Sequence, residues 1–255
     1  MELILFLATV VCLLLCGYIG VTTRSPVFLI VALTAMVGGI GTPLWHLLYG
    51  IAYDASFSTI FGGYVPTIAV LGGWVMVFPT IIVFMALRRQ FGMYGHIQSW
   101  AVIGGMLMYF WVIELLGVQT GMWSYDNEIA AFGFPFSLFL ALLHTFCAAA
   151  MLRILFDYWR LSLKVTLQLI PIWLGLQILT YALFGAPYYA MSYLSNNTWL
   201  MSIGLLCSLG IIGWGFVIIV NGFVNLTSNV GQTARIRIQP EPPYDESTTT
   251  VSYEK

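Results

Sequence analysis

The chain has 255 residues, of which 60% are hydrophobic and only 7% are charged. Soluble domains usually carry about 25% charged residues, so this composition excludes an ordinary soluble protein and predicts an integral membrane protein. The formal net charge of -1 and the absence of any recognisable nucleic-acid-binding motif also exclude nucleic acid as a partner.

Seven apolar stretches are long enough to span a bilayer, which takes about 20 residues of helix. They are residues 3–21, 26–49, 65–87, 99–118, 135–156, 165–184 and 199–223. Only Met1 and Glu2 precede the first stretch, and neither is basic, so we expect a retained helix rather than a signal peptide. The sequence therefore predicts an all-α, polytopic integral membrane protein with seven transmembrane helices.

The nine Lys and Arg residues all fall on one side of this arrangement. They are Arg24, Arg88, Arg89, Arg153, Arg160, Lys164, Arg235, Arg237 and Lys255. Basic residues accumulate on the cytoplasmic side of membrane proteins. We therefore expect the N-terminus outside, the C-terminus in the cytoplasm, and the second, fourth and sixth loops on the outer or lumenal face.

Two regions differ sharply in composition. Residues 1–227 form the predicted seven-helix membrane domain. Residues 228–255 are polar and contain P-E-P-P-Y-D-E-S-T-T-T, which cannot bury enough apolar surface to fold alone. We expect this segment to be a disordered cytoplasmic tail.

The second predicted helix is interrupted by small residues and a proline. These are Gly38, Gly39, Gly41 and Pro43. They permit a kink and close backbone approach, which suits the wall of a cavity. The following segment, 50–64, is too short and too polar to span, so we expect it to lie along the interface or to fold back between helices.

The outer end of this helix carries a group of polar and aromatic side chains. They are Trp45, His46, Tyr49, Tyr53 and Asp54. Tyr and Trp commonly anchor a helix at the membrane interface. We therefore take only His46 and Asp54 from this group as candidate catalytic residues.

Glu114 is the one acidic residue predicted inside a membrane span. It lies about 6 Å below the outer boundary, four residues of helical rise from the helix end. An ionisable residue at such a position usually marks a functional site, although a hydrogen-bonded Glu114 that only locks two helices together is the alternative. Trp111 lies on the same helix face, which predicts either a pocket wall or simple packing.

Further candidates surround Glu114 along the chain. The loop after it holds Trp123, Tyr125, Asp126 and Glu128, and the fifth predicted helix holds His144. An isolated imidazole in apolar surroundings needs a hydrogen-bond partner. Glu114 and His144 lie on consecutive helices at similar depth, and the sequence leaves open whether they touch. The sixth predicted helix follows, and residues 184–198 are expected to form its outer loop.

Neither a metal nor a cofactor is indicated. Cys12, Cys16, Cys147 and Cys207 all lie in apolar stretches. The four-residue spacing of Cys12 and Cys16 is more typical of packing than of a metal site. No P-loop, dinucleotide fingerprint, G-x-S-x-G or H-E-x-x-H motif is present, so we expect cofactor-free chemistry.

Three blocks of the sequence resemble a known pattern. They are E-L-L-G-V-Q-T-G-M-W-S-Y at 114–125, G-F-P at 133–135 and A-M-L-R-I-L-F-D at 150–157. Together they resemble the AveC-like spirocyclase family of polytopic membrane proteins. A similar E-x-x-G-x-x-T-G run occurs in membrane carotenoid cyclases and hydratases. After F-P the spirocyclase family tends to place a second acidic residue, where this chain has Ser137, Leu138 and Phe139.

The resemblance implies acid–base rearrangement of a lipophilic polyketide or terpenoid by ring closure, dehydration or hydration. Apolar surroundings favour the neutral form of a carboxylic acid, so Glu114 is the expected general acid. The candidate catalytic residues are Glu114, Asp126, His144, His46 and Asp54. The candidate substrate-binding residues are Trp111, Trp123, Tyr125 and Glu128. The ring faces of the three aromatic residues would shield a developing cation, and Glu128 is a further candidate base.

Two other functions stay open at this point. A transporter of lipids or small molecules predicts a polar path across the whole bilayer. A non-catalytic scaffold predicts that Glu114 and His144 touch each other with no cavity beside them. The expected partners of an enzyme are a lipophilic small molecule and membrane lipids.

Overall fold

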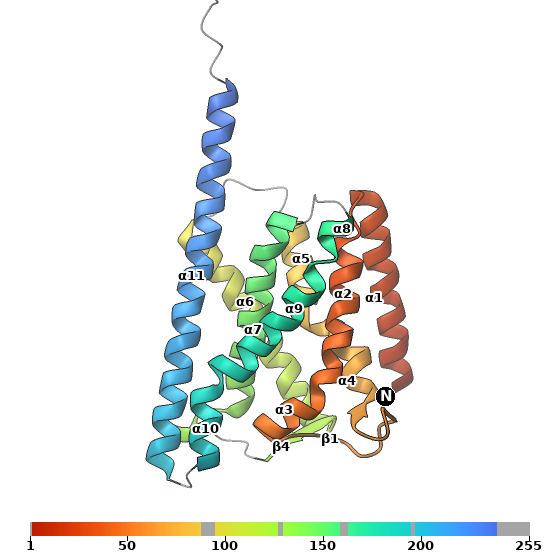
Figure 1. Ribbon diagram of the computed structural model, residues 1–255, viewed down its shortest axis with the longest axis vertical. Coiled ribbons are helices and arrows are strands. Elements are labelled where there is room, and N and C mark those ends of the chain that lie inside the picture. Colours follow the sequence, from red (N-terminus) through yellow and green to blue (C-terminus); the bar gives the residue numbers. More distant parts are fainter. Residues whose placement is uncertain (1, 88–94, 127–129, 159–162, 195–196, 239–255) are drawn as a thin grey trace, which may run out of the picture.

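The computed structural model describes residues 2–87, 95–126, 130–158, 163–194 and 197–238. This part of the chain is largely helical, and its long helices lie side by side (Figure 1). Within it, six helical segments are long and apolar enough to cross a membrane: Glu2–Thr23, Val27–Tyr49, Thr67–Leu87, His96–Gln119, Phe136–Asp157 and Thr198–Asn225. A seventh results if the bent pair Leu169–Phe184 and Ala186–Leu194 is one span. The predicted class, an all-α multi-pass membrane protein, is confirmed.

The second and third of these spans are broken in the middle. Their elements are α2 (Val27–Gly38), the 3₁₀ turn η1 (Gly39–Gly41) and α3 (Thr42–Tyr49), then α4 (Thr67–Leu71), η2 (Gly72–Met76) and α5 (Phe78–Leu87). A side chain at Gly39 would overlap the Ala69 carbonyl. One at Gly73 would overlap the Ala35 carbonyl. The glycines therefore allow the two broken spans to cross in backbone contact.

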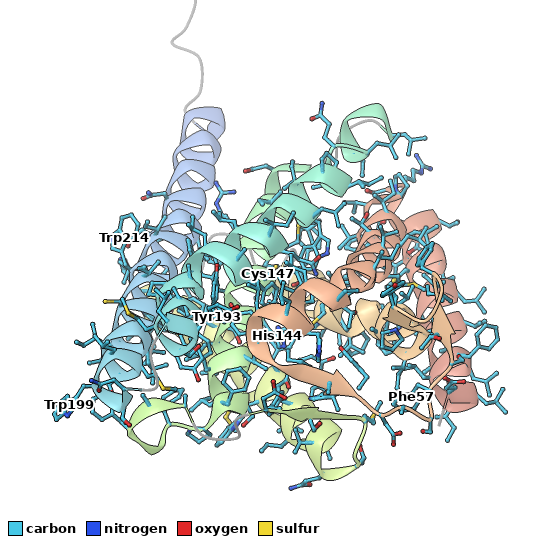
Figure 2. All side chains as sticks on the ribbon, turned by 60° about the horizontal axis from the view of Figure 1, so that its bottom comes forward. Phe57, His144, Cys147, Tyr193, Trp199 and Trp214 are labelled. Atoms are coloured by element: carbon cyan, nitrogen blue, oxygen red, sulfur yellow. The ribbon has the colours of Figure 1, made fainter. Side chains whose placement is uncertain are left out.

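Helix α7 (Phe136–Tyr158) lies at the centre of the bundle. It packs against α5, against α6 (His96–Gln119) and against α11 (Thr198–Ile238). Ala148 and Ala149 on α7 are fully buried, and such small residues let neighbouring backbones approach closely. The central position of α7 places its His144 in the interior (Figure 2).

Helices α1 (Glu2–Thr23) and α11 lie at opposite edges of the bundle (Figure 1). Many of their apolar side chains are exposed, and Trp199 and Trp214 project outward from α11 (Figure 2). In a membrane protein these apolar surfaces face lipid rather than water.

The predicted sixth span, 165–184, is more complex in the structure. It comprises α8 (Leu163–Thr166), α9 (Leu169–Ile178), the π-helical turn η4 (Leu179–Phe184) and α10 (Ala186–Leu194), with a bend of 45° before α10. The sequence predicts a loop at 184–198, and most of it is the helix α10 instead. Pro187 suits the first turn of a helix. The buried ring of Tyr188 packs against Phe139 and holds α10 on the bundle.

Two short antiparallel ribbons, which the sequence does not predict, lie at the end of the bundle that holds the N-terminus. Strand β1 (Ile51–Tyr53) pairs with β4 (Trp123–Tyr125), and β2 (Thr59–Ile60) pairs with β3 (Val65–Pro66). Gly50 ends α3 in the left-handed conformation at φ 59, which favours glycine. The β1–β4 ribbon joins the segment after α3 to the segment after α6.

Helix α11 continues to Ile238, so the predicted tail boundary at residue 228 lies within it. Residues 228–238 contain no proline, which is the residue tolerated least well inside a helix. Residues 239–255 lie outside the described part of the chain.

Candidate functional site

Glu114 on α6 and His144 on α7 are in direct contact. The distance from Glu114 Oε1 to His144 Nε2 is 2.6 Å. Glu114 is only 6% exposed, and α6 and α7 pack along their length. An ionisable side chain in such surroundings is stable only when it is paired or hydrogen-bonded, and this pairing meets that requirement for both residues.

The second oxygen of Glu114 receives hydrogen bonds from strand β4. Trp123 Nε1 donates to Glu114 Oε2 at 3.2 Å, and the Tyr125 hydroxyl also donates to Oε2. Trp123 and Tyr125 are two residues apart on a strand, so their side chains point to the same side. A side chain at Gly117 would overlap the Trp123 ring. Gly117 thus makes room for the indole beside α6.

Both hydrogen-bond partners of Oε2 are donors. Burial raises the pKa of Tyr125, and the charge of Glu114 and its hydrogen bond raise that pKa further. Tyr125 is therefore a stable O–H donor, and an indole N–H can only donate. Two donors thus occupy Oε2, and Oε1 is the oxygen that faces His144 Nε2.

Tyr181 extends this network on the other side of His144. Its hydroxyl is hydrogen-bonded to His144 Nδ1, and its backbone carbonyl accepts a hydrogen bond from the Tyr49 hydroxyl. Tyr181 lies in η4, and π-helical turns often occur at functional sites. A side chain at Gly185 would overlap the Tyr49 hydroxyl. Tyr181 is not among the site residues predicted from the sequence. The only sequence feature that points to it is a tyrosine inside an apolar span.

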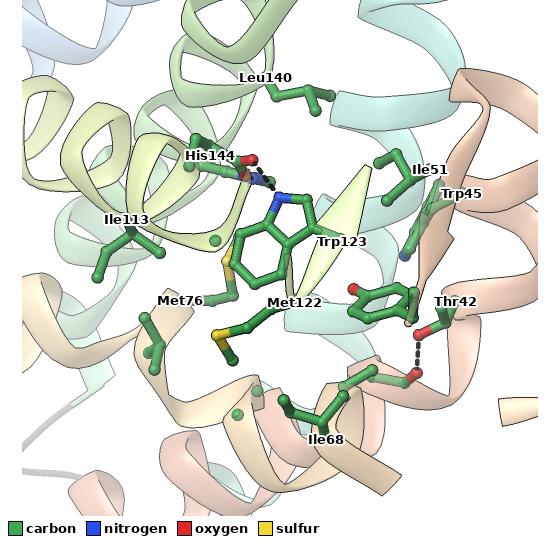
Figure 3. Close-up of a pocket in the computed structure, with 18 of the residues that line it drawn as sticks. Thr42, Trp45, Ile51, Ile68, Met76, Ile113, Met122, Trp123, Leu140 and His144 are labelled. Carbon is green, nitrogen blue, oxygen red and sulfur yellow. Dashed lines mark hydrogen bonds and ion pairs between the residues drawn. The ribbon is translucent and has the colours of Figure 1, made fainter. Parts of the chain in front are cut away.

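A cavity of about 380 Å³ adjoins this network. Typical small-molecule sites have about 300–1,000 Å³. Glu114, His144 and Tyr181 lie on its wall, and most of its other lining residues are apolar or aromatic. Figure 3 shows the Trp123 indole pointing toward His144, with Ile68 at the opposite end of the cavity.

Three predicted catalytic residues do not line the cavity: His46 lies on α3, and Asp54 and Asp126 directly follow strands β1 and β4. His46, Asp54 and Asp126 are exposed, and none belongs to the cavity wall. His46 Nδ1 is 2.8 Å from the Ile51 carbonyl oxygen. The Asp54 carboxylate accepts the Ser56 N–H, and this hydrogen bond holds the Asp54 pKa below its usual value. Charged side chains on a loop stay hydrated at lower cost than in the bundle.

Of the predicted substrate-binding residues, Trp111 does not line the cavity and Glu128 is not described by the structure. Trp111 packs against the core and is not part of the cavity wall. Its buried Nε1 has no hydrogen-bond partner among the described residues. Glu128 lies outside the described residues. Trp123 and Tyr125 are the predicted substrate-binding residues whose hydrogen bonds to Glu114 the structure describes.

The residues that the structure describes contain no group of three or more His, Cys, Asp or Glu placed to hold a metal ion. Cys12 and Cys16 are buried on α1. Their four-residue spacing is explained by packing.

These features define a multi-pass helical membrane protein with a buried Glu–His–Tyr network beside an apolar cavity. Comparison of the chain with known protein families, characterised proteins and solved structures finds no match. The resemblance to the spirocyclase family therefore stays a prediction, and function is argued from the geometry of the site.

Proposed function

We propose that this protein is a membrane-embedded, cofactor-free enzyme of the cyclase or hydratase type that acts on a lipophilic small molecule. The observation that carries the proposal is the 2.6 Å contact between Glu114 and His144 on the wall of an apolar cavity. A scaffold needs no such cavity beside the pair. General acid–base catalysis needs a donor and an acceptor within reach of a bound substrate, and this arrangement supplies both.

The pair can hold one exchangeable proton without a large cost. In one protonation state the proton is on Oε1 and Glu114 is the general acid. A substrate that inserts between Oε1 and His144 Nε2 takes this proton and faces His144 as the acceptor. After the acid has protonated a hydroxyl, carbonyl or alkene, the carboxylate is stabilised by the N–H of Trp123 and the O–H of Tyr125. In a ring closure, His144 removes a proton from the cyclised substrate and returns it to Glu114. The cycle therefore balances without any redox partner.

Aromatic rings surround the place where a cation would form. Trp45, Tyr53, Phe110 and Trp123 all belong to the cavity wall, and ring faces attract cations most strongly where water is excluded. This lining supports a substrate that develops positive charge, as polyketide and terpenoid rearrangements do. The resemblance of residues 114–125 to the spirocyclase family points to the same substrates.

We also propose that the bent pair before α11 forms one span, which makes seven spans in all. Glu2 and the end of α11 then lie on opposite sides, as they do in Figure 1. The one-sided Lys and Arg residues support a cytoplasmic C-terminus. In this orientation the β1–β4 ribbon and Glu114 lie toward the outer face.

The test replaces Glu114 by Gln, which keeps the shape of the side chain and removes its transferable proton. Asp157→Asn is the matched control, because Asp157 makes an exposed pair with Arg153 at 2.7 Å, away from the cavity. Metabolite profiles are compared among cells with wild type, each variant and a deletion, at equal protein levels in the membrane. We expect Glu114→Gln to lower turnover about 10²–10⁴-fold. A Gln variant that matches wild type while the deletion shows a phenotype would favour the scaffold.

A further inference from the structure

The cavity has two chemically different ends. The hydrogen-bonding groups of Glu114, His144 and Tyr181 gather at one end. Ile68, from the broken third span, lies at the other end (Figure 3), and Gly72, four residues further along that span, also lines the cavity. A ligand that fits both ends must place a polar group at the first and hydrocarbon at the second, because an unpaired polar group in an apolar pocket is unfavourable.

The apolar end has unfilled space at Gly72. A Cβ placed on Gly72 would meet only Leu5 within 4 Å, at 3.9 Å. The neighbouring glycine differs, because a side chain at Gly73 would overlap the Ala35 carbonyl. Gly72 therefore sets the depth of the cavity without being needed for helix packing.

One part of the cavity wall reaches the surface that faces lipid. Leu116 on α6 lines the cavity and is 50% exposed. About two helical turns earlier on α6, the Tyr109 hydroxyl donates to the Val75 carbonyl at 3.2 Å and closes α6 onto η2. Met76 and Met122 also line the cavity (Figure 3). Methionine is flexible and can rearrange at low cost.

We propose that the cavity binds an amphiphile with one hydrogen-bonding head group and a hydrocarbon tail, which enters from the bilayer between α6 and η2 past Leu116. The head group lies against Glu114, His144 and Tyr181, and the tail extends toward Gly72. This inference rests on the proposed function for what happens at the head group. The entrance and the tail site rest on the shape and lining of the cavity.

The test uses photoreactive hexadecanol with a diazirine in the middle of its chain, added to the full-length protein in lipid nanodiscs. After illumination, the labelled residues are mapped by mass spectrometry, with and without excess unlabelled hexadecanol. We expect competed labelling on α4 and η2 and on residues 113–117 of α6. Labelling that is spread over the outer surfaces of α1 and α11 and is not competed would overturn the proposal.

Two variants test the tail site and the entrance separately. Gly72→Leu fills the apolar end and should lower competed labelling at least about tenfold, since several methylene groups lose their place. Leu116→Trp narrows the entrance and should slow labelling by a similar factor. The matched controls are Gly104→Leu and Val112→Trp, on exposed positions of α6 outside the cavity wall, which should label as wild type does. Equal labelling of Gly72→Leu and wild type would contradict the tail site.

The same experiment separates this inference from the proposed function. Glu114→Gln weakens one head-group contact but leaves the tail site unchanged, so its α4 and η2 labelling should persist at no less than about one tenth of the wild-type level, as the loss of one hydrogen bond predicts. If this labelling persists and turnover is also unchanged, the catalytic role of Glu114 fails while the lipid-accessible binding site stands. If Glu114→Gln abolishes tail labelling in a folded protein, the tail site itself is contradicted.

Discussion

The indole of Trp123 lies against the backbone of Gly117, in space that any side chain at position 117 would occupy. Gly117 is on α6, one turn from Glu114, and Trp123 is on β4, which pairs with β1. This single close approach connects the β1–β4 ribbon to the buried carboxyl group. It explains how a loop residue donates a hydrogen bond inside the bundle.

Replacing Gly117 by Ala should therefore displace Trp123 and weaken the site. Overpacking of this kind typically costs about 1–3 kcal/mol, and the displaced indole no longer donates to Glu114. We expect a lower thermal unfolding midpoint in detergent and a lower turnover. Gly105→Ala, on the same helix with open space around it, should be close to wild type. Equal midpoints for the two variants would show that Trp123 is not seated against Gly117.

Tyr181→Phe tests whether the hydroxyl on η4 positions His144. The change removes the hydrogen bond to His144 Nδ1 and leaves a buried ring nitrogen without that partner. A lost hydrogen bond to a buried group costs about 1–3 kcal/mol, so turnover should fall about tenfold to hundredfold and its pH profile should shift. Tyr188→Phe, buried outside the cavity, is the control. A Tyr181→Phe protein with an unchanged rate and pH profile would rule out the positioning role.

Asp54→Asn and Asp126→Asn should leave turnover within about threefold of wild type, because substitutions on an exposed surface usually change the free energy by at most about 0.5 kcal/mol. Both side chains are exposed and lie outside the cavity wall. The measurement is the same metabolite comparison that is used for Glu114→Gln. A hundredfold loss for either variant would place that carboxylate in the catalytic machinery and require the outer loops to close over the cavity.

The orientation is tested with reporter fusions. A reporter after Lys255 should be cytoplasmic, and one inserted within 119–133 should be on the outer face, because the sequence predicts all Lys and Arg residues on the opposite side from that loop. An external signal from the first fusion, or a cytoplasmic signal from the second, would show that the orientation is reversed.

Much of the fold follows from local sequence because each span needs a long apolar stretch. The choice of Glu114 as a candidate site residue also follows from the sequence, because carboxyl groups are rare inside membrane spans. The sequence places His144 at a similar depth, but it does not determine which face of α7 points toward Glu114. The structure fixes that rotation and brings the two side chains together.

Other features depend on long-range packing that no local pattern reveals. Tyr181 reaches His144 only because η4 is a π-helical turn, which changes the face that a residue presents. The β1–β4 pairing brings together segments about 70 residues apart and selects Trp123 and Tyr125, rather than the equally eligible Asp126, to meet Glu114. The composition of the loop after α6 predicts site residues there. Which of its side chains point inward is decided by the alternation of side chains along β4.

The most direct test of the proposed chemistry is the rate at which isolated membranes convert the metabolite that accumulates in the deletion strain. The proposal predicts that membranes with Glu114→Gln convert it about 10²–10⁴-fold more slowly than wild type, while membranes with Asp157→Asn convert it at the wild-type rate. Equal rates for Glu114→Gln and wild type, at equal amounts of folded protein, would contradict a proton-transfer role for the Glu114–His144 pair.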